Sequence, residues 1–225
     1  MLVSEMYEIV NFNISSLYPD KMFLDSVILR EINRTLKEIA GAYCIQALQK
    51  TKIITLEAYE DSITGYEAKT RLPTDYDHDL YRARNATQET DITMLFPNVA
   101  AMKACYDGTT LTGSVEALAW DGTYIWGLLC PETAEDIPIS YYKVPDALAD
   151  DTDKPDCLPT RLHEGLLVDG ATVRLLKRIP EEIKAGGVNM KYHMGENATA
   201  LGQLAELCKF SPRTTPYYDR NIQYF

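Results

Sequence analysis

The feature that most constrains the fold is a long amphipathic stretch, from about residue 21 to residue 50. Apolar residues recur there at three- and four-residue steps for several turns, and Arg30, Glu31 and Arg34 belong to the opposite face. That period is the period of an α-helix. A shorter stretch with the same period precedes it and ends before Pro19. Two N-terminal helices are therefore expected.

The period changes after residue 51, where β-branched and aromatic residues favour strands. Asp121-Gly122 is a turn dipeptide between two alternating segments, which predicts a β-hairpin. We expect the strand at 66–72 to pair with the strand at 52–59, and a short helix, interrupted near Pro97, over 91–106. The expected strands cover residues 52–59, 66–72, 115–120, 123–129 and 137–144.

Helical periodicity returns at about residues 158–177, where Pro180 follows as a helix stop, and again at 198–209. The order of elements predicts an α+β fold, a helical bundle of two N-terminal and two C-terminal helices with an inserted antiparallel β-region. A single domain would then cover residues 1–210, with helices in about 1–50 and 158–209 and the β-rich insertion in about 52–144. Residues 211–225 are expected to form an extended C-terminal arm.

The charge of the chain limits what it can bind. Its 33 acidic and 22 basic residues give a net charge of −11, which argues against a surface built to hold nucleic acid or an anionic membrane. No apolar run approaches the roughly 20 residues that span a bilayer, and no signal peptide is visible. The five cysteines form no CxxC pair, which favours reduced thiols in a cytosolic setting.

A search for catalytic motifs gives no enzyme signal, so we expect no catalytic residues, no metal and no cofactor. The nucleophile elbow, the phosphate loop and the dinucleotide fingerprint are all missing from the sequence. His163-Glu164 lacks the second histidine of a zinc motif. His193 and Glu196 have the spacing of half a di-iron motif without the other half. His78, between two aspartates, is expected in a solvated loop.

Residues 145–159 form an acidic, proline-marked connection. Closely spaced carboxylates are the usual ligands of Ca²⁺, but the spacing does not match a calcium loop and Pro155 interrupts it. A solvated loop that caps a helix is the favoured interpretation, with cation binding as the alternative. The acids concerned are Asp146, Asp150, Asp151, Asp153 and Asp156.

The block from residue 137 to residue 177 resembles the phage head-to-tail adaptor (connector) proteins. Its order of motifs is a strand ending in a tyrosine pair, a Pro-x-x-Leu turn, an aspartate-rich loop, a Leu-Pro step and a helix with a histidine and a Leu-Leu-x-x-Gly-Ala core. Weaker similarity lies at 32–43, 71–76 and 122–131, whereas 91–106 and everything after Gly186 match nothing in the family. The residues that carry the resemblance are Tyr141, Tyr142, Pro145, Asp153, Pro155, Pro159, His163, Leu167 and Gly170.

The resemblance implies a structural virion protein without enzymatic activity. Such a protein is a subunit of a homo-oligomeric ring, dodecameric in this family, that joins the portal protein to a downstream tail or nozzle protein. It is located in the neck of the virion, and in the host cytoplasm during assembly, without a membrane. DNA passes through its channel without specific binding, and the net charge predicts an acidic or neutral channel wall.

The C-terminal arm is expected, by the same resemblance, to bind the portal. Its aromatic residues suit docking on a neighbour, and 15 tyrosines against five phenylalanines suit partly exposed contact surfaces. Two alternatives stay open: another neck or tail-completion protein, and a small acidic metal-dependent hydrolase that uses residues 146–156 with His163. The arm residues are Pro212, Arg213, Pro216, Tyr217, Tyr218, Arg220, Tyr224 and Phe225.

Overall fold

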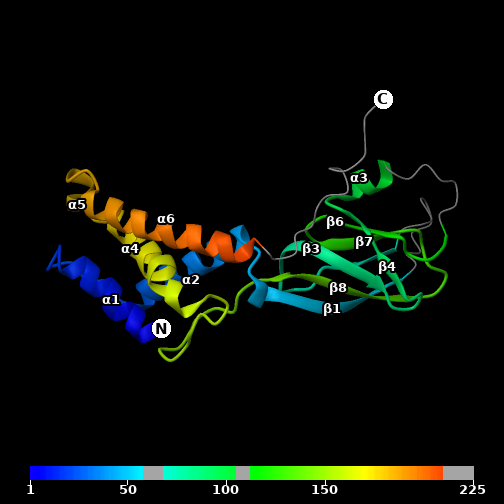
Figure 1. Cartoon of the computed structure of the whole chain (residues 1–225), viewed down its shortest axis with the longest axis horizontal. Coiled ribbons are helices and arrows are strands. Elements are labelled where there is room, and N and C mark those ends of the chain that lie inside the picture. Colours follow the sequence, from blue (N-terminus) through cyan, green and yellow to red (C-terminus); the bar gives the residue numbers. More distant parts are fainter. Residues whose placement is uncertain (58–67, 105–111, 210–225) are drawn as a thin grey trace. The chain divides into compact units, whose positions relative to one another are not determined.

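The computed structural model describes residues 1–57, 68–104 and 112–209 (Figure 1). They belong to two compact units. The helical unit contains residues 1–48 and 144–209, and the β unit contains the described residues between 49 and 143. None of the helices in the described part is long and apolar enough to cross a membrane. The expectation of a single domain over residues 1–210 stays a prediction.

The helical unit is built around one buried helix, α4. Seven of the eight residues of α4 are buried, and it contacts α1, α2 and α6. Figure 1 shows α4 between α6 and α1. The elements of the unit are α1 (Val3–Ser15), α2 (Asp25–Ala42), the 3₁₀ turn η1 (Gln46–Leu48), the 3₁₀ turn η2 (Thr160–Leu162), the π-helical turn η3 (Glu164–Val168), α4 (Asp169–Leu176), α5 (Pro180–Lys184) and α6 (Val188–Cys208).

Local sequence signals explain where these helices begin and end. The helix expected over 21–50 ends at Ala42, because Tyr43 takes an extended conformation and the chain enters a strand at Gln49. Pro180 opens α5 at a position that needs no N–H donor. Gly186 and Gly187 both have positive φ angles, which glycine adopts without strain, and they separate α5 from α6.

Two glycines allow the helices to approach α4 and the turn before it. A Cβ atom on Gly165 would lie 2.7 Å from the Cβ of Ala200 on α6. A Cβ atom on Gly170 would lie 2.7 Å from Cγ2 of Thr35 on α2. Both distances are shorter than any ordinary carbon contact, so larger side chains there would push the helices apart.

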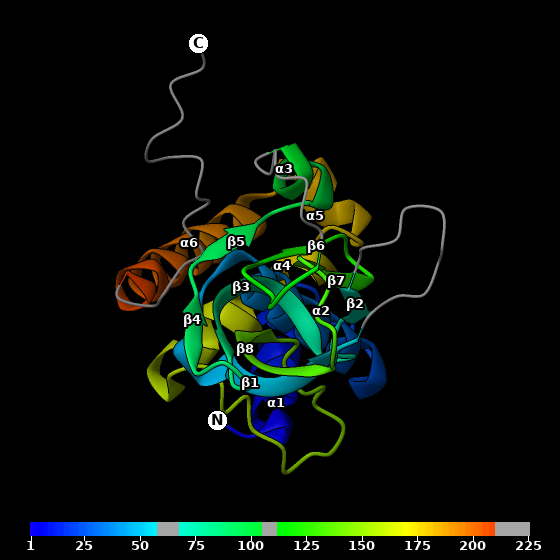
Figure 2. The same cartoon turned by 90° about the vertical axis from the view of Figure 1, so that its right-hand side faces the viewer.

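The β unit consists of two four-stranded sheets with a shared core (Figure 2). One sheet has the order β1-β8-β3-β4 and is antiparallel; the other has the order β2-β7-β6-β5, with β5 and β6 parallel. Apolar side chains of both sheets, among them Leu56, Leu80, Leu118 and Ile139, form the core between them. The strands are β1 (Gln49–Leu56), β2 (Ala68–Arg71), β3 (Tyr76–Asn85), β4 (Thr90–Ile92), β5 (Met94–Phe96), β6 (Ala117–Trp120), β7 (Tyr124–Leu128) and β8 (Glu135–Lys143).

A short helix, α3 (Val99–Ala104), packs on the second sheet and contacts β5, β6 and β7. A second, smaller cluster of buried side chains lies between α3 and the sheet. The side-chain oxygen of Asn98 accepts a hydrogen bond from the N–H of Ala101 at 2.8 Å, which caps the start of this helix.

The expected fold, a four-helix bundle with an inserted antiparallel β-region, is wrong. The described part has six α-helices and two four-stranded sheets, one of them mixed, and strands dominate the middle of the chain. The strands build a core of their own in a separate compact unit. Periodicity missed α5 because it is only five residues long, and it could not reveal that two sheets face each other. The expected C-terminal arm lies outside the described residues.

Among the individual elements expected from the sequence, some form as expected and others do not. The β6–β7 hairpin at Asp121-Gly122 is confirmed. The strand at 66–72 was expected beside β1, but β2 pairs with β7 instead. The helix expected over 91–106 is wrong before Pro97, where β4 and β5 form, and a helix begins only at Val99. The cysteines at 44, 130, 157 and 208 form no disulfides, and three of them are buried.

Candidate functional site

Tyr141 and Tyr142 lie near the end of strand β8, and their side chains point to opposite faces of the sheet. Tyr141 lies in the core of the β unit, where its hydroxyl donates a hydrogen bond to Asp75 at 2.7 Å. Burial, and then the Asp75 carboxylate, raise the pKa of Tyr141. The Tyr142 ring stacks on His78 with 5.0 Å between the ring centroids. Both tyrosines are fully buried, so they support the strand from its two sides.

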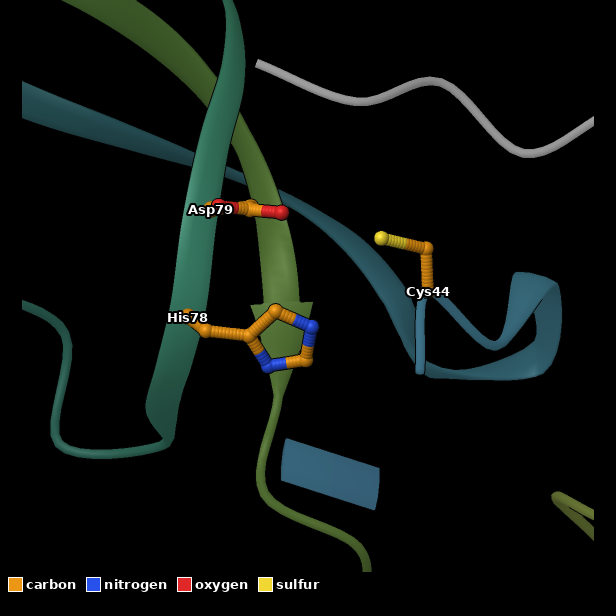
Figure 3. A group of neighbouring side chains, drawn as sticks. All are labelled: Cys44, His78 and Asp79. Carbon is orange, nitrogen blue, oxygen red and sulfur yellow. The ribbon is translucent and has the colours of Figure 1, made fainter. Parts of the chain in front are cut away.

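His78 was expected in a solvated loop, and that expectation is wrong. It lies in β3, where the pairing with β8 is interrupted and Asp79 takes a positive φ angle (Figure 3). Its Nδ1 lies 2.7 Å from a carboxylate oxygen of Asp77. Cys44, which Figure 3 also labels, belongs to the helical unit and is buried.

The acidic connection, residues 145–159, is held to helix α2 by one side chain. The amide of Asn33 donates a hydrogen bond to the Leu148 carbonyl at 2.8 Å, and its oxygen accepts one from the Leu148 N–H at 2.9 Å. In this clamp, the Asn33 side chain donates to and accepts from the same residue, as a residue of a neighbouring antiparallel strand would. Pro145 and Leu148 are both buried beside it, so the first part of the connection has a fixed path.

Asp153 holds the tip of the acidic connection in a turn. Its carboxylate accepts hydrogen bonds from the N–H groups of Ala149 and Asp150, at 2.7 and 2.9 Å, and these bonds lower the pKa of Asp153. The backbone carbonyls of Asp151 and Asp153 accept hydrogen bonds from Ser4 and Val3 at the start of α1. The connection therefore caps α1 with its backbone oxygens. Its acids were expected to cap the helix that follows it, but the first turn there, η2, has no side-chain cap.

The alternative of a cation site in the acidic connection gains no geometric support. Within the described residues, its acids do not form a group of three with ligand atoms within 4.8 Å of one another. The Asp153 carboxylate is used by the backbone instead.

The prolines and the histidine of the block organise the entry into the central helix. Pro155 is buried and its carbonyl accepts a hydrogen bond from Leu158, while Pro159 precedes the first turn, η2. His163 is 2% exposed, and its Nε2 lies 3.0 Å from the Leu158 carbonyl. Burial lowers the pKa of His163, so the neutral ring donates from Nε2 to that carbonyl.

A π-helical turn leads into α4, and one side chain of α6 supports it. Asn197 donates hydrogen bonds to the carbonyls of Gly165 and Leu166 at 2.8 and 3.0 Å. A π-turn leaves such carbonyls without their usual helical partners. Leu167 is completely buried in this turn, and Gly170 follows it at the close contact with α2.

His193 is not placed as a metal ligand beside Glu196. Its Nδ1 lies 2.7 Å from Asp169 on α4, and both side chains are buried, whereas Glu196 is exposed. The pair lies at a polar hollow of about 360 Å³ between α6 and the segment leading to α4, which Asn13 of α1 also lines.

A second groove, of about 490 Å³, lies on the other side of α4, between α2 and α6. Its lining is mainly apolar, with Ile39, Val173 and Leu201, and two cationic side chains, Arg174 and Lys177, belong to it. The central helix thus leaves two grooves of different chemistry on the helical unit.

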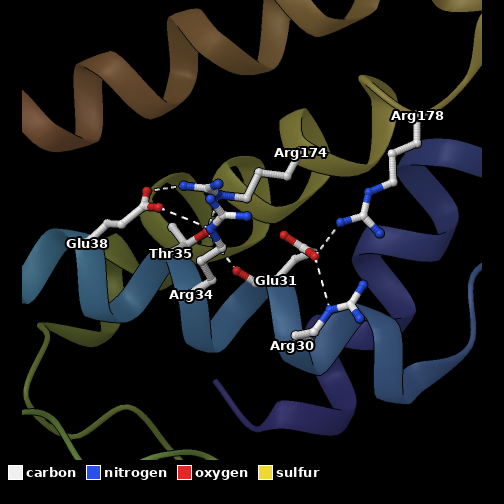
Figure 4. Close-up of polar contacts among 7 residues, drawn as sticks. All are labelled: Arg30, Glu31, Arg34, Thr35, Glu38, Arg174 and Arg178. Atoms are coloured by element: carbon white, nitrogen blue, oxygen red, sulfur yellow. Dashed lines mark hydrogen bonds and ion pairs between the residues drawn. The ribbon is translucent and has the colours of Figure 1, made fainter.

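Buried and exposed charges link α2 to α4 (Figure 4). Glu31, with its side chain only 3% exposed, binds Arg30 at 3.3 Å and Arg178 at 2.5 Å. Glu38 binds Arg34 at 3.3 Å and also Arg174. Arg34 and Glu38 pair within α2 at i,i+4 spacing, whereas Glu31 binds Arg178 from the distant end of the chain. Nothing in the local pattern could have identified partners more than 130 residues away.

The predicted portal-binding residues lie outside the described residues. No family model matches this chain, and no curated protein matches it. The predicted arm consists of Pro212, Arg213, Pro216, Tyr217, Tyr218, Arg220, Tyr224 and Phe225.

Proposed function

We propose that the protein is a structural subunit of a ring that joins a phage portal to the tail, a head-to-tail adaptor. The observation that carries the proposal is the adaptor-like block at 137–177 together with the role its residues play in the fold. Tyr141 anchors the end of β8 through Asp75, Asp153 holds the acidic connection in its turn, and His163 and Gly170 fix the entry and the packing of the central helix. An order of motifs with such supporting contacts suits a rigid building block.

The surface of the helical unit also suits a ring. Subunits of a closed ring meet head to tail, so each needs two different surfaces that fit one another. The mainly apolar groove and the polar hollow show that the helical unit presents surfaces of different chemistry, as such a contact requires. The proposed ring is dodecameric, as in the family that the block resembles, and its channel wall is acidic or neutral.

The proposed partners are the portal protein on one side and a tail or nozzle protein on the other, in the neck of the virion. The direct test is to express the chain with the portal protein encoded by the same genome and to image the purified complexes. We expect a ring of this protein on the portal. Portal rings that carry none of it, under conditions that keep both proteins folded, would contradict the proposal and leave another neck or tail-completion role.

The arm has its own test. Deleting residues 211–225 should remove portal binding and leave the folded units intact, because the deletion begins after the last described helix. Circular dichroism of the shortened chain, compared with that of the full chain, checks that the units stay folded. Unchanged assembly on the portal would contradict a portal-binding arm.

The alternative of an acidic hydrolase at residues 146–156 is not proposed. His163 is buried against a backbone carbonyl, and Asp153 binds backbone N–H groups, so the geometry favours supporting roles for both side chains. Metal analysis of the purified chain distinguishes the two functions, since the hydrolase requires a stoichiometric ion.

A further inference from the structure

The helical unit carries a basic face in a chain whose net charge is −11. Its cations come from α2 and from α4 with the two residues that follow it, and four of them gather around Glu31 and Glu38 in Figure 4. Six cations thus stand against two carboxylates. We define the basic face as Arg30, Arg34, Lys37, Arg174, Lys177 and Arg178.

The positive charge of this face points mostly to solvent. The Glu31 side chain is almost completely buried, whereas the side chains of Arg30 and Arg34 are 64% and 62% exposed. Lys37 and Lys177 are exposed as well. Two carboxylates cannot neutralise six cations, so the face presents a positive field to whatever approaches it.

The basic face continues into the apolar groove between α2 and α6. Arg174 and Lys177 line that groove together with Val173 and with Met194, which is 48% exposed. An apolar hollow with a charged border is the usual composition of a protein contact surface, in which charge selects the partner and burial stabilises the contact.

The acidic connection is a surface of opposite sign on the same unit. It holds five aspartates and one lysine, and Asp150, Asp151 and Asp156 are exposed. The clamp from Asn33 and the turn around Asp153 fix its backbone before any partner arrives. A preorganised surface loses little conformational entropy on binding.

We propose that the basic face of one copy binds the acidic connection of the neighbouring copy in the ring. This inference rests on the proposed adaptor function and names the surfaces through which its subunits meet. A ring requires two different, mutually complementary patches on each subunit, and these two surfaces have opposite charges of similar size. A second copy is therefore favoured over the phosphate backbone of DNA, the other polyanion that a basic face attracts.

Charge reversal in the full chain tests the proposal. The first variant, Lys37→Glu with Lys177→Glu, reverses two exposed cations without touching the Glu31 and Glu38 ion pairs. The second, Asp150→Lys with Asp156→Lys, reverses two exposed acids, which neutralises the connection as a whole and leaves the Asp153 turn in place. A control, Lys52→Glu with Arg71→Glu, makes the same change in net charge as the first variant on exposed residues of the β unit.

Ring formation on the portal is measured for each variant by sedimentation and imaging. Each helical-unit variant should lower the ring yield at a given protein concentration about tenfold or more, whereas the control should stay close to the wild type. In a 1:1 mixture of the two helical-unit variants, alternation around an even-membered ring pairs each changed face with a changed connection and each wild-type face with a wild-type connection. The combined four-residue variant pairs changed with changed surfaces at every contact. Both should recover most of the wild-type yield. Circular dichroism confirms that each variant is folded.

Three outcomes overturn the inference. If both reversals leave ring formation unchanged, neither surface takes part in the contact between subunits. If the combined variant does not recover, the two surfaces do not contact one another. If Lys37→Glu with Lys177→Glu leaves rings intact but removes salt-dependent binding of a DNA duplex of about 30 base pairs, the face belongs to DNA. Failure of the wild-type chain to form any ring on the portal would instead contradict the proposed function itself.

Discussion

The helical unit buries the carboxylates of Glu31, Asp169 and Glu182, and the β unit buries that of Glu135. Glu182 and Glu135 are both held by uncharged donors, but the donors come from different parts of the fold. In the helical unit, Glu182 of α5 is completely buried. It accepts hydrogen bonds from the Tyr18 hydroxyl at 2.5 Å, from the Asn189 amide at 2.9 Å and from the Met190 N–H at 2.8 Å. Two of these donors belong to the first turn of α6, so Glu182 acts as the cap of that helix.

In the β unit, Glu135 at the start of β8 is 3% exposed. Its donors are the Asn85 amide at 2.7 Å, the Ser114 hydroxyl at 2.8 Å and the Val115 N–H at 2.9 Å. They come from the end of β3 and from the segment before β6. This carboxylate therefore ties together strands of both sheets, whereas Glu182 mainly completes a helix end nearby in the sequence.

The comparison teaches that a buried charge is tolerated in either architecture when several donors converge on it. Burial alone would raise the pKa of Glu182, but the bonds from Tyr18, Met190 and Asn189 outweigh it, and the pKa is lowered. The units can be followed separately, because both tryptophans, Trp120 and Trp126, belong to the β unit. Tryptophan fluorescence therefore reports the β unit, and far-ultraviolet circular dichroism reports mainly the helices.

The largest expected effect comes from removing the buried carboxylates. Glu182→Ala should cost about 3–5 kcal/mol, because it leaves three donors without a partner, and it should lower the urea midpoint of the dichroism transition. Glu135→Ala should have a similar cost in the fluorescence transition. Glu206→Ala, on the exposed end of α6, is the control. If both probes shift together in both variants, the two units unfold as one and the comparison fails.

The next effect concerns the close approach of helices. Gly170→Ala should lower the free energy of unfolding of the helical unit by about 1–3 kcal/mol, because its Cβ meets Thr35 at 2.7 Å. Gly202→Ala on α6 has nothing within 4 Å and should stabilise the helix by about 0.5–1 kcal/mol. The two alanine variants are compared in one urea series, and equal signs would contradict the assigned close contact.

A smaller effect is expected from pH. Burial lowers the pKa of His163, so the unfolded chain binds a proton more readily than the folded chain. The contribution of His163 is complete above its ordinary pKa of about 6.5 and is lost as the pH falls below that value. His163→Gln should therefore flatten the fall in stability of the helical unit as the pH drops below about 6.5. The same slope in wild type and variant would assign the effect to another group.

The smallest effect is expected at the β6–β7 turn. The Asp121 carboxylate accepts hydrogen bonds from the N–H groups of Tyr124 and Thr123 at 2.8 and 2.9 Å, and they lower the pKa of Asp121. Asp121→Ala should cost the β unit about 1 kcal/mol in the fluorescence transition. The difference should shrink as the pH falls below about 3.9, where the carboxylate takes up a proton. A loss of helical signal instead would contradict the separation of the units.

Local patterns in the sequence predicted the elements whose formation depends on nearby residues. The periodicity of α1 and most of α2 and the Asp121-Gly122 hairpin are of this kind. The alternation of residues did not predict the pairing of β2, because that pairing depends on a distant strand. β2 pairs with β7 rather than with the preceding strand. The alternation also failed at β4 and β5, since three-residue strands have too few residues for a period.

In the candidate site, too, some features are visible in the sequence and others appear only in the structure. The order of motifs from Tyr141 to Gly170 is visible in the sequence alone, and it marks a block whose residues support the fold. The clamp of Asn33 on Leu148 and the bond of His193 to Asp169 join residues that are 115 and 24 positions apart, and no spacing rule connects them.

The sequence by itself determined the acidic balance of the chain, the helices with a clear apolar face and the block that suggests an adaptor. The tertiary structure alone decided that two sheets enclose a separate core and that α4 is surrounded by three helices. It also decided that a basic face exists, because its arginines lie on α2, on α4 and just after α4, and they are brought together only when those helices pack through Gly170 and Thr35. Charge composition sums over the whole chain, whereas a binding surface depends on which charges folding places side by side.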